Sequence, residues 1–201
     1  MSDVVLAGGL WMPVMGMALL GARLGRQGFS THVFDYSGRD SLEGNVERLV
    51  RHARDHGRAH FVGHSLGGVL IFDMLNRHPE VDAASVVLLG APVRGCLAGR
   101  RLAVSTFGRW MMGATAPRWG ERDATWVRPE PLGIIAGTLP IGLGWMTGRL
   151  PGRSDGVVRV EETVVHGMAQ QVMVPLGHSF LLASAQVAGL VERFFATRRF
   201  A

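Results

Sequence analysis

The sequence predicts an α/β fold: a mostly parallel sheet of about six strands with helices on both of its faces. Two observations support this prediction. Short runs of β-branched or apolar residues alternate with longer stretches of helical spacing, which is typical of a parallel sheet covered on both sides. The 201 residues also suffice for one sizeable core, and no linker-like stretch interrupts them, so we expect a single domain over residues 1–201.

The expected elements follow one another in regular order. The strands are expected at residues 4–7, 31–35, 60–63, 85–89, 133–137 and 171–174. The helices are expected at residues 15–27, 42–56, 66–77 and 183–197, with Ser41 as the N-cap of the second.

The alternation breaks between residues 92 and 131, and we interpret this interval as an insertion in the domain. It holds three of the five tryptophans and seven arginines, a composition that suits a cap over the site or a face that meets a lipid interface. A helical excursion that buries its own tryptophans is the alternative. Trp110 and Met111 from the insertion, and Trp11 from the loop after the first strand, are the candidate substrate contacts.

The composition excludes several other classes of protein. The net charge is +5, but the 21 basic residues are all arginine and are scattered, so no nucleic-acid partner is expected. Cys96 is the one cysteine, which excludes an internal disulfide and a cysteine metal cluster, and we expect no metal and no other cofactor.

The uncharged stretch over residues 4–22 is about long enough to span a membrane. However, it contains Gly8, Gly9 and Pro13 and follows no basic segment, so a buried strand, a glycine turn and a helix explain it better. Without a signal segment, the cytoplasm is the expected compartment.

The stretch "HFVGHSLGGVLIFDML" places Ser65 where an apolar strand meets an apolar helix. A serine on such a tight turn needs glycine at Gly63 and Gly67, because a Cβ there would clash with neighbouring backbone. The turn presents the hydroxyl at the edge of the sheet, and the amide of Leu66 lies at the positive end of the helix, where it can stabilise an oxyanion. The alternative is a glycine-rich turn with a capping serine. His64 is interpreted as a packing residue.

Five motifs, "VLAGGL", "FVGHSLGG", "LLGAPVRG", "SDGVV" and "LGHSF", together resemble the α/β-hydrolase superfamily, and more closely its small lipase-like and esterase-like serine hydrolases. The resemblance covers nearly the whole chain. It implies an α/β-hydrolase fold and a catalytic order along the chain of nucleophile, acid and histidine.

On this order His178 is the base, because it directly follows the last strand, whereas His166 precedes that strand. The resemblance favours Asp155 as the acid that orients His178, although Asp-Gly turns are also ordinary on protein surfaces. It further implies a second oxyanion donor after the first strand, the amide of Leu10, with Gly8 and Gly9 in place of the usual His-Gly pair.

The expected function is therefore hydrolysis of a small-molecule or lipid-like carboxylic ester through an acyl-serine formed on Ser65, with peripheral membrane contact as a further expectation. Acyl transfer and thioester or amide cleavage use the same groups and stay open. A catalytically silent protein that binds an apolar ligand is the alternative from another class.

Overall fold

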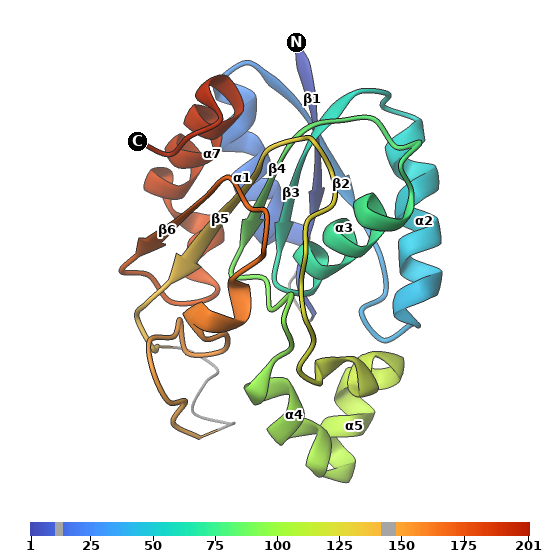
Figure 1. Cartoon of the computed structure of the whole chain (residues 1–201), viewed down its shortest axis with the longest axis vertical. Helices are drawn as coiled ribbons and strands as arrows, with labels where there is room; N and C mark the ends of the chain where they lie inside the picture. Colours follow the sequence, from blue (N-terminus) through green and yellow to red (C-terminus); the bar gives the residue numbers. More distant parts are fainter. Residues whose placement is uncertain (11–13, 142–147) are drawn as a thin grey trace.

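Six parallel strands form one sheet in the order β2-β1-β3-β4-β5-β6 (Figure 1). The computed structural model describes residues 1–10, 14–141 and 148–201, without the side chains of residues 14, 111 and 116–118. The strands are β1 (Ser2–Ala7), β2 (Phe29–Phe34), β3 (Ala59–His64), β4 (Ala83–Leu89), β5 (Leu132–Gly137) and β6 (Gln170–Val174). The predicted parallel sheet with helices on both faces is confirmed.

The helices cover both faces of the sheet. They are α1 (Val14–Arg26), α2 (Leu42–Arg54), α3 (Leu66–Arg77), α4 (Leu97–Val104), α5 (Thr106–Met112), α6 (Phe180–Ala183) and α7 (Ala185–Thr197). Helices α2 and α3 pack on one face, and α1 and α7 pack on the other (Figure 1).

The strand β1 illustrates why the sequence forms a two-sided sheet. Its Val5 faces the core built with α2 and α3, while Val4 and Leu6 face the core built with α1 and α7. Because successive side chains point to opposite faces, a strand covered on both sides must be apolar at every position. This burial explains the first, uncharged part of the stretch over residues 4–22, which is Val4–Ala7 in β1. No helix among the described residues is long and apolar enough to cross a membrane.

The ends of the helices follow local sequence signals. The hydroxyl of Ser41 accepts a hydrogen bond from the amide of Gly44, so the predicted N-cap of α2 is confirmed. Ser184 caps α7 in the same way through the amide of Val187. The helix predicted over residues 183–197 therefore begins at Ala185, and the short helix α6 precedes it.

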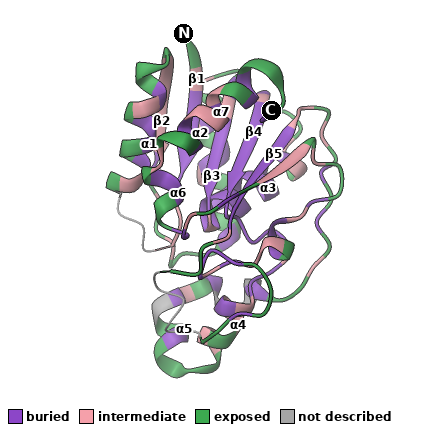
Figure 2. Cartoon of the chain, turned by 90° about the vertical axis from the view of Figure 1, so that its left-hand side faces the viewer, coloured by how far each residue is buried: buried purple, intermediate pink, exposed green. Residues whose placement is uncertain are grey.

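The insertion over residues 92–131 forms α4, α5 and a 3₁₀ helix over Gly113–Trp119, and then returns as extended chain to β5. These helices lie beyond the carboxyl ends of the strands (Figure 1), and their outer surfaces are exposed (Figure 2). Trp119 and Trp126 are buried, whereas 60% of Trp110 is exposed. The insertion thus buries two of its tryptophans and presents the third to solvent.

Candidate functional site

Ser65 lies on a strained turn between β3 and α3. Its backbone has φ 55° and ψ −124°, outside the regions that a serine ordinarily occupies, which costs about 1–3 kcal/mol. The surrounding contacts hold this conformation: the amide of Ser65 donates to Leu89 at the end of β4, and its carbonyl accepts from Gly68 and Val69 in α3. Its neighbours Gly63, His64, Leu66 and Gly67 are buried, but Ser65 is half-buried.

The glycines of this turn are sterically required, as the sequence predicts. A Cβ on Gly63 would lie 2.4 Å from the Cα of Gly68, and one on Gly67 would lie 2.2 Å from the carbonyl oxygen of Ala7. Both neighbouring atoms belong to the backbone and cannot move aside. The amide of Leu66 begins α3, where no carbonyl one turn earlier can accept its hydrogen bond, so it is available to a ligand.

His178 and Asp155 form a buried hydrogen-bonded pair. The Nδ1 of His178 lies 2.7 Å from Oδ2 of Asp155, and the two residues are 8% and 1% exposed. The other carboxylate oxygen accepts from the amides of Val157 and Val158 at 2.9 and 2.7 Å, so both oxygens of Asp155 are hydrogen-bonded. Because a carboxylate only accepts, Nδ1 of His178 is the donor in their bond.

The backbone of His178 is held from both sides. Its amide donates to the carbonyl of Asp155 at 2.9 Å, and its carbonyl accepts from Nε2 of His64 at 3.1 Å. The ring centroids of His64 and His178 lie 4.5 Å apart. Burial, followed by the neighbouring His178 imidazole, lowers the pKa of His64 to about 3, so His64 stays neutral. The interpretation of His64 as a packing residue is therefore incomplete: it also links the turn of Ser65 to the loop of His178.

The loop after β1 packs directly against Ser65. A Cβ on Gly9 would lie 2.7 Å from Cβ and 3.2 Å from Oγ of Ser65, so only glycine permits this approach. The hydroxyl of Tyr36 donates to the carbonyl of Gly8 at 2.6 Å and steadies the loop. Leu10 follows Gly9 and packs on Gly38, and its role as an oxyanion donor remains a prediction. The sequence analysis missed Tyr36, which carries no motif of its own.

Of the three candidate substrate contacts, the structure describes the side chain of Trp110. Trp110 lies on the exposed side of α5, where Phe107 and Arg39 are its ring neighbours. Met111 belongs to the same helix, but its side chain is not among those that the structure describes. Trp11 also lies outside the described residues. Their contact with substrate stays a prediction.

Other acidic residues between Ser65 and His178 have different partners. Asp73 pairs with Arg122 at 3.1 Å, and Glu130 pairs with Arg128 at 2.7 Å. His166 lies before β6, where its backbone bonds to Ala124 and Trp126. Of the three, none shares the pairing seen at His178 and Asp155.

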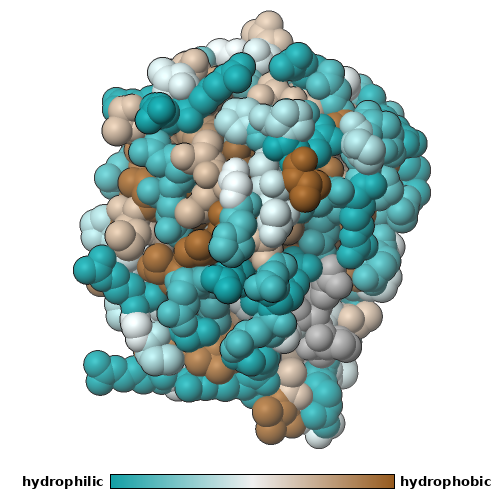
Figure 3. All heavy atoms as spheres, in the orientation of Figure 1, coloured by the Kyte–Doolittle hydropathy of each residue, from teal (hydrophilic) through white to brown (hydrophobic). Residues whose placement is uncertain are grey.

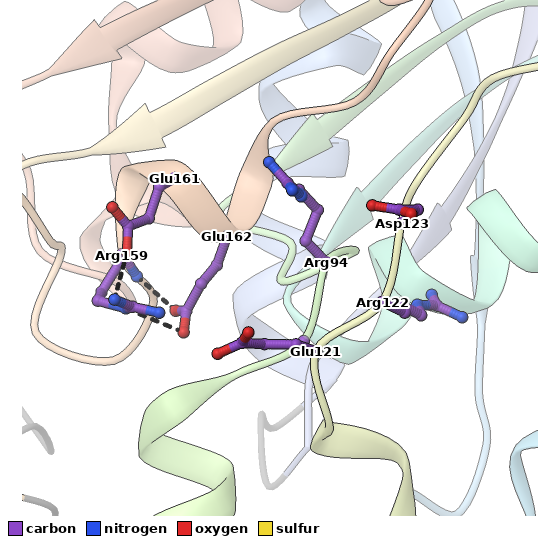
Figure 4. Close-up of a pocket in the computed structure, with 8 residues that line it drawn as sticks. Arg94, Glu121, Arg122, Asp123, Arg159, Glu161 and Glu162 are labelled. Atoms are coloured by element: carbon purple, nitrogen blue, oxygen red, sulfur yellow. Dashed lines mark hydrogen bonds and ion pairs between the residues drawn. The ribbon is translucent and has the colours of Figure 1, made fainter.

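A hollow of about 520 Å³ with a charged lining lies between the loop after β4 and the 3₁₀ helix Val160–Thr163 (Figure 4). Most of its charges are paired: Arg159 bonds to both Glu161 and Glu162, and Glu121 bonds to Arg100. Glu162 also accepts from the first amide of α4, that of Leu97, at 2.6 Å, which ties the insertion to the chain that follows the Asp155 loop. Within the described part of the chain, no three His, Cys, Asp or Glu side chains are arranged to hold a metal ion.

No protein-family model matches this sequence, and no curated protein resembles it significantly. Solved structures, however, share its fold. A pyrethroid hydrolase from Sphingobium faniae JZ-2 superposes with a TM-score of 0.64 at 16% identity, over 98% of both chains. The thioesterase domain of Vlm2 gives a TM-score of 0.65 at 15% identity, over 98% of this chain and 96% of that one.

A carboxylesterase structure from the thaumarchaeon Nitrososphaera gargenis gives a TM-score of 0.63 at 12% identity, over 97% of this chain and 90% of that one. Identities this low establish the architecture alone. The strand order, the serine turn after β3 and the near-complete overlap with these enzymes lead to one conclusion: this chain has the α/β-hydrolase fold.

Proposed function

We propose that the protein is a serine hydrolase that cleaves carboxylic esters through an acyl-serine intermediate. The observation that carries the proposal is the 2.7 Å bond between Nδ1 of His178 and Asp155, at the same edge of the sheet as the strained turn of Ser65. This bond fixes the imidazole tautomer in which Nε2 can accept a proton. A buried carboxylate, an imidazole and a half-buried hydroxyl are the groups that nucleophilic catalysis requires.

In the proposed reaction, Oγ of Ser65 attacks the acyl carbon of the ester while its proton passes to Nε2 of His178. The carbonyl oxygen of the ester becomes an oxyanion, which the amides of Leu66 and Leu10 stabilise. Collapse of this intermediate breaks the bond to the alcohol, which leaves with the proton from His178. Water then repeats the sequence on the acyl-serine, releases the acid and restores Ser65.

Asp155 stays ionised throughout this cycle and stabilises the imidazolium that forms on His178. Its two backbone donors and the imidazole together satisfy the carboxylate, so its orientation does not depend on substrate. The structurally similar enzymes include a pyrethroid hydrolase, a carboxylesterase and a thioesterase domain, which supports cleavage of an acyl bond. We expect the acyl or alcohol part of the substrate to pack against the 92–131 insertion.

The test is covalent labelling by a fluorophosphonate probe, which reacts with activated serines. Wild-type protein and Ser179→Ala should be labelled, and Ser65→Ala and His178→Ala should not. Ser179 is the matched control, because it follows His178 directly and only begins α6. Labelling that persists in Ser65→Ala would assign the reactive serine elsewhere, and an unlabelled wild type would favour the silent binding protein.

A panel of p-nitrophenyl esters and the matching thioesters then separates the remaining alternatives. Turnover of esters with a dependence on acyl length would support the proposed substrate class. Preference for thioesters, or transfer of the acyl group to an added alcohol, would place the same serine in a different reaction.

A further inference from the structure

The end of the insertion presents apolar side chains that no part of the described chain buries. Val104 at the end of α4 is 80% exposed, and Phe107 and Trp110 on α5 are each 60% exposed. The rings of Phe107 and Trp110 stack with their centroids 6.0 Å apart. We call these three residues the α4–α5 tip. Figure 3 shows hydrophobic residues at the end of the molecule where Figure 1 places α4 and α5.

The insertion is able to bury large apolar side chains, so the exposure of the tip is not a general property of its helices. Met112 on the same helix α5 is 1% exposed, and Trp119 in the following 3₁₀ helix is 6% exposed. The insertion thus has one apolar side that packs inward and a second, separate apolar side that faces solvent. Clustered exposed aromatic residues of this kind mark an interaction surface more often than isolated ones do.

The sequence of the insertion helices is rich in arginine, although Arg100 is paired with Glu121 just beyond them. From residue 97 to residue 120 the chain contains four arginines, Arg100, Arg101, Arg109 and Arg118, and no aspartate or glutamate. The guanidinium of Arg39, from the loop after β2, lies 4.9 Å from the centroid of the Trp110 ring. Arg109 donates to the carbonyls of Ala103 and Val104 and so places its charge beside the exposed valine.

Exposed aromatic side chains together with nearby arginines favour one kind of partner. Tryptophan and arginine both join an apolar body to a polar end, which suits the boundary between water and lipid, and arginines near a membrane are attracted to anionic headgroups. A second copy of the chain fits less well, because a symmetric contact between two tips would set arginines against arginines. We propose that the α4–α5 tip docks the protein on a membrane surface that contains anionic lipid.

The docked orientation has a consequence for the site, which rests on the proposed function. The tip and Ser65 both lie beyond the carboxyl ends of the strands, so docking turns this edge of the sheet toward the lipid. The substrates would then be esters that reside at the membrane boundary rather than freely dissolved ones.

The test is flotation with vesicles of phosphatidylcholine alone and of phosphatidylcholine with 40% phosphatidylglycerol, using the Ser65→Ala protein so that no lipid is consumed. We expect at least roughly tenfold stronger binding to the anionic vesicles, because each arginine near the surface contributes about a fivefold gain in affinity. Binding should fall as NaCl rises from 0.05 to 0.5 M, since salt screens this attraction. Equal binding to both vesicles, or no binding, would overturn the proposal.

Two variants locate the contact. Phe107→Ser and Trp110→Ser should each weaken binding about tenfold, because each removes a large apolar side chain from the lipid boundary. Val127→Ser is the matched control: Val127 is 69% exposed, but it lies beside Asn76 at the far end of α3, away from the tip. An equal loss of vesicle binding in the control and tip variants would overturn the proposal. A wild-type dimer in gel filtration that is absent in Trp110→Ser would also overturn it.

The vesicle experiment is independent of catalysis. Ser65→Ala can dock without turning over any ester, and probe labelling of the wild type needs no membrane. Failure of one experiment therefore leaves the other conclusion standing. If a tip variant does not fold, the dependence of vesicle binding on salt and on anionic lipid, measured with an intact tip, still tests the proposal.

Discussion

Replacement of Gly90 by alanine should disable the candidate site while leaving the protein folded. Gly90 directly follows β4 and has φ +51°. A Cβ at this position would lie 2.9 Å from Oδ2 of Asp155 and 3.2 Å from Nδ1 of His178, the two atoms joined by the 2.7 Å hydrogen bond. The new methyl group would therefore press on both partners of that bond.

Gly90→Ala should lower both the stability of the fold and the rate of the proposed reaction, and the structure sets the size of each effect. Alanine in the left-handed backbone region costs about 1–2 kcal/mol, which for a chain of this length lowers Tm by about 2–8 °C. An ordinary van der Waals contact begins near 3.4 Å, so the carboxylate of Asp155 must retreat by about half an ångström. A displacement of this order in the group that orients the proposed base should cost roughly 10- to 100-fold in rate.

Gly57→Ala is the matched control, because Gly57 has φ +58° and a Cβ there would meet nothing within 4 Å. We expect both variants to lose similar Tm by calorimetry, and only Gly90→Ala to lose kcat/KM on a p-nitrophenyl ester and labelling rate with the fluorophosphonate. If Gly90→Ala keeps kcat/KM within about threefold of Gly57→Ala, the Asp155–His178 pair is not part of the catalytic apparatus.

Three further predictions concern His64 and Cys96. His64→Leu removes the donor to the carbonyl of His178 and should lower kcat about tenfold with little change in KM. His64→Gln keeps an N–H donor and should retain most of the wild-type kcat. Equal kcat in the two variants would show that the bond is unimportant. Because burial lowers the pKa of folded His64 from 6.5 to about 3, the unfolded chain binds a proton that the folded chain refuses, so stability is lost as pH falls below 6.5. Urea unfolding at pH 6 and pH 5 should show about 1 kcal/mol more loss in the wild type than in His64→Gln. Burial raises the pKa of Cys96 to about 12, so a disulfide reagent at pH 8 should modify the native protein roughly a hundredfold more slowly than the urea-unfolded one; equal rates would mean that the thiol is accessible.

The parts of the fold that the sequence predicts correctly are those that local patterns determine. The helix α3 has the predicted bounds, because a buried apolar pattern follows directly on the Ser65 turn. The expected clashes at Gly63 and Gly67 are also confirmed, since a strand that runs straight into a helix brings backbones together whatever the rest of the fold does. The helices α4 and α5 lie in the interval where the alternation breaks.

The relations that the sequence does not reveal join segments distant along the chain. The bond from His64 to the carbonyl of His178 spans 114 positions, and nothing in the motifs "FVGHSLGG" and "LGHSF" indicates it. The bond from Tyr36 to Gly8 likewise depends on how β2 lies beside β1. Exposure of Trp110 beside buried Trp119 follows from the way α5 packs, because the residue type is the same at both positions.

The strand order explains why the pair of Asp155 and His178 lies beside Gly90. Ser65 follows β3 and the pair of Asp155 and His178 follows β5 and β6, but β4 lies between them in the sheet. Strands are spaced about 4.8 Å apart, so Ser65 and Asp155 start from strands about 10 Å apart. The pair can reach toward Ser65 only by leaning across the end of β4. The sheet ladder continues to this point, since the amide of Ser65 donates to Leu89 and that of Gly90 donates to Ile135. A side chain on the first residue after β4 would press on the bond between Asp155 and His178, so glycine at this position leaves room for that pair.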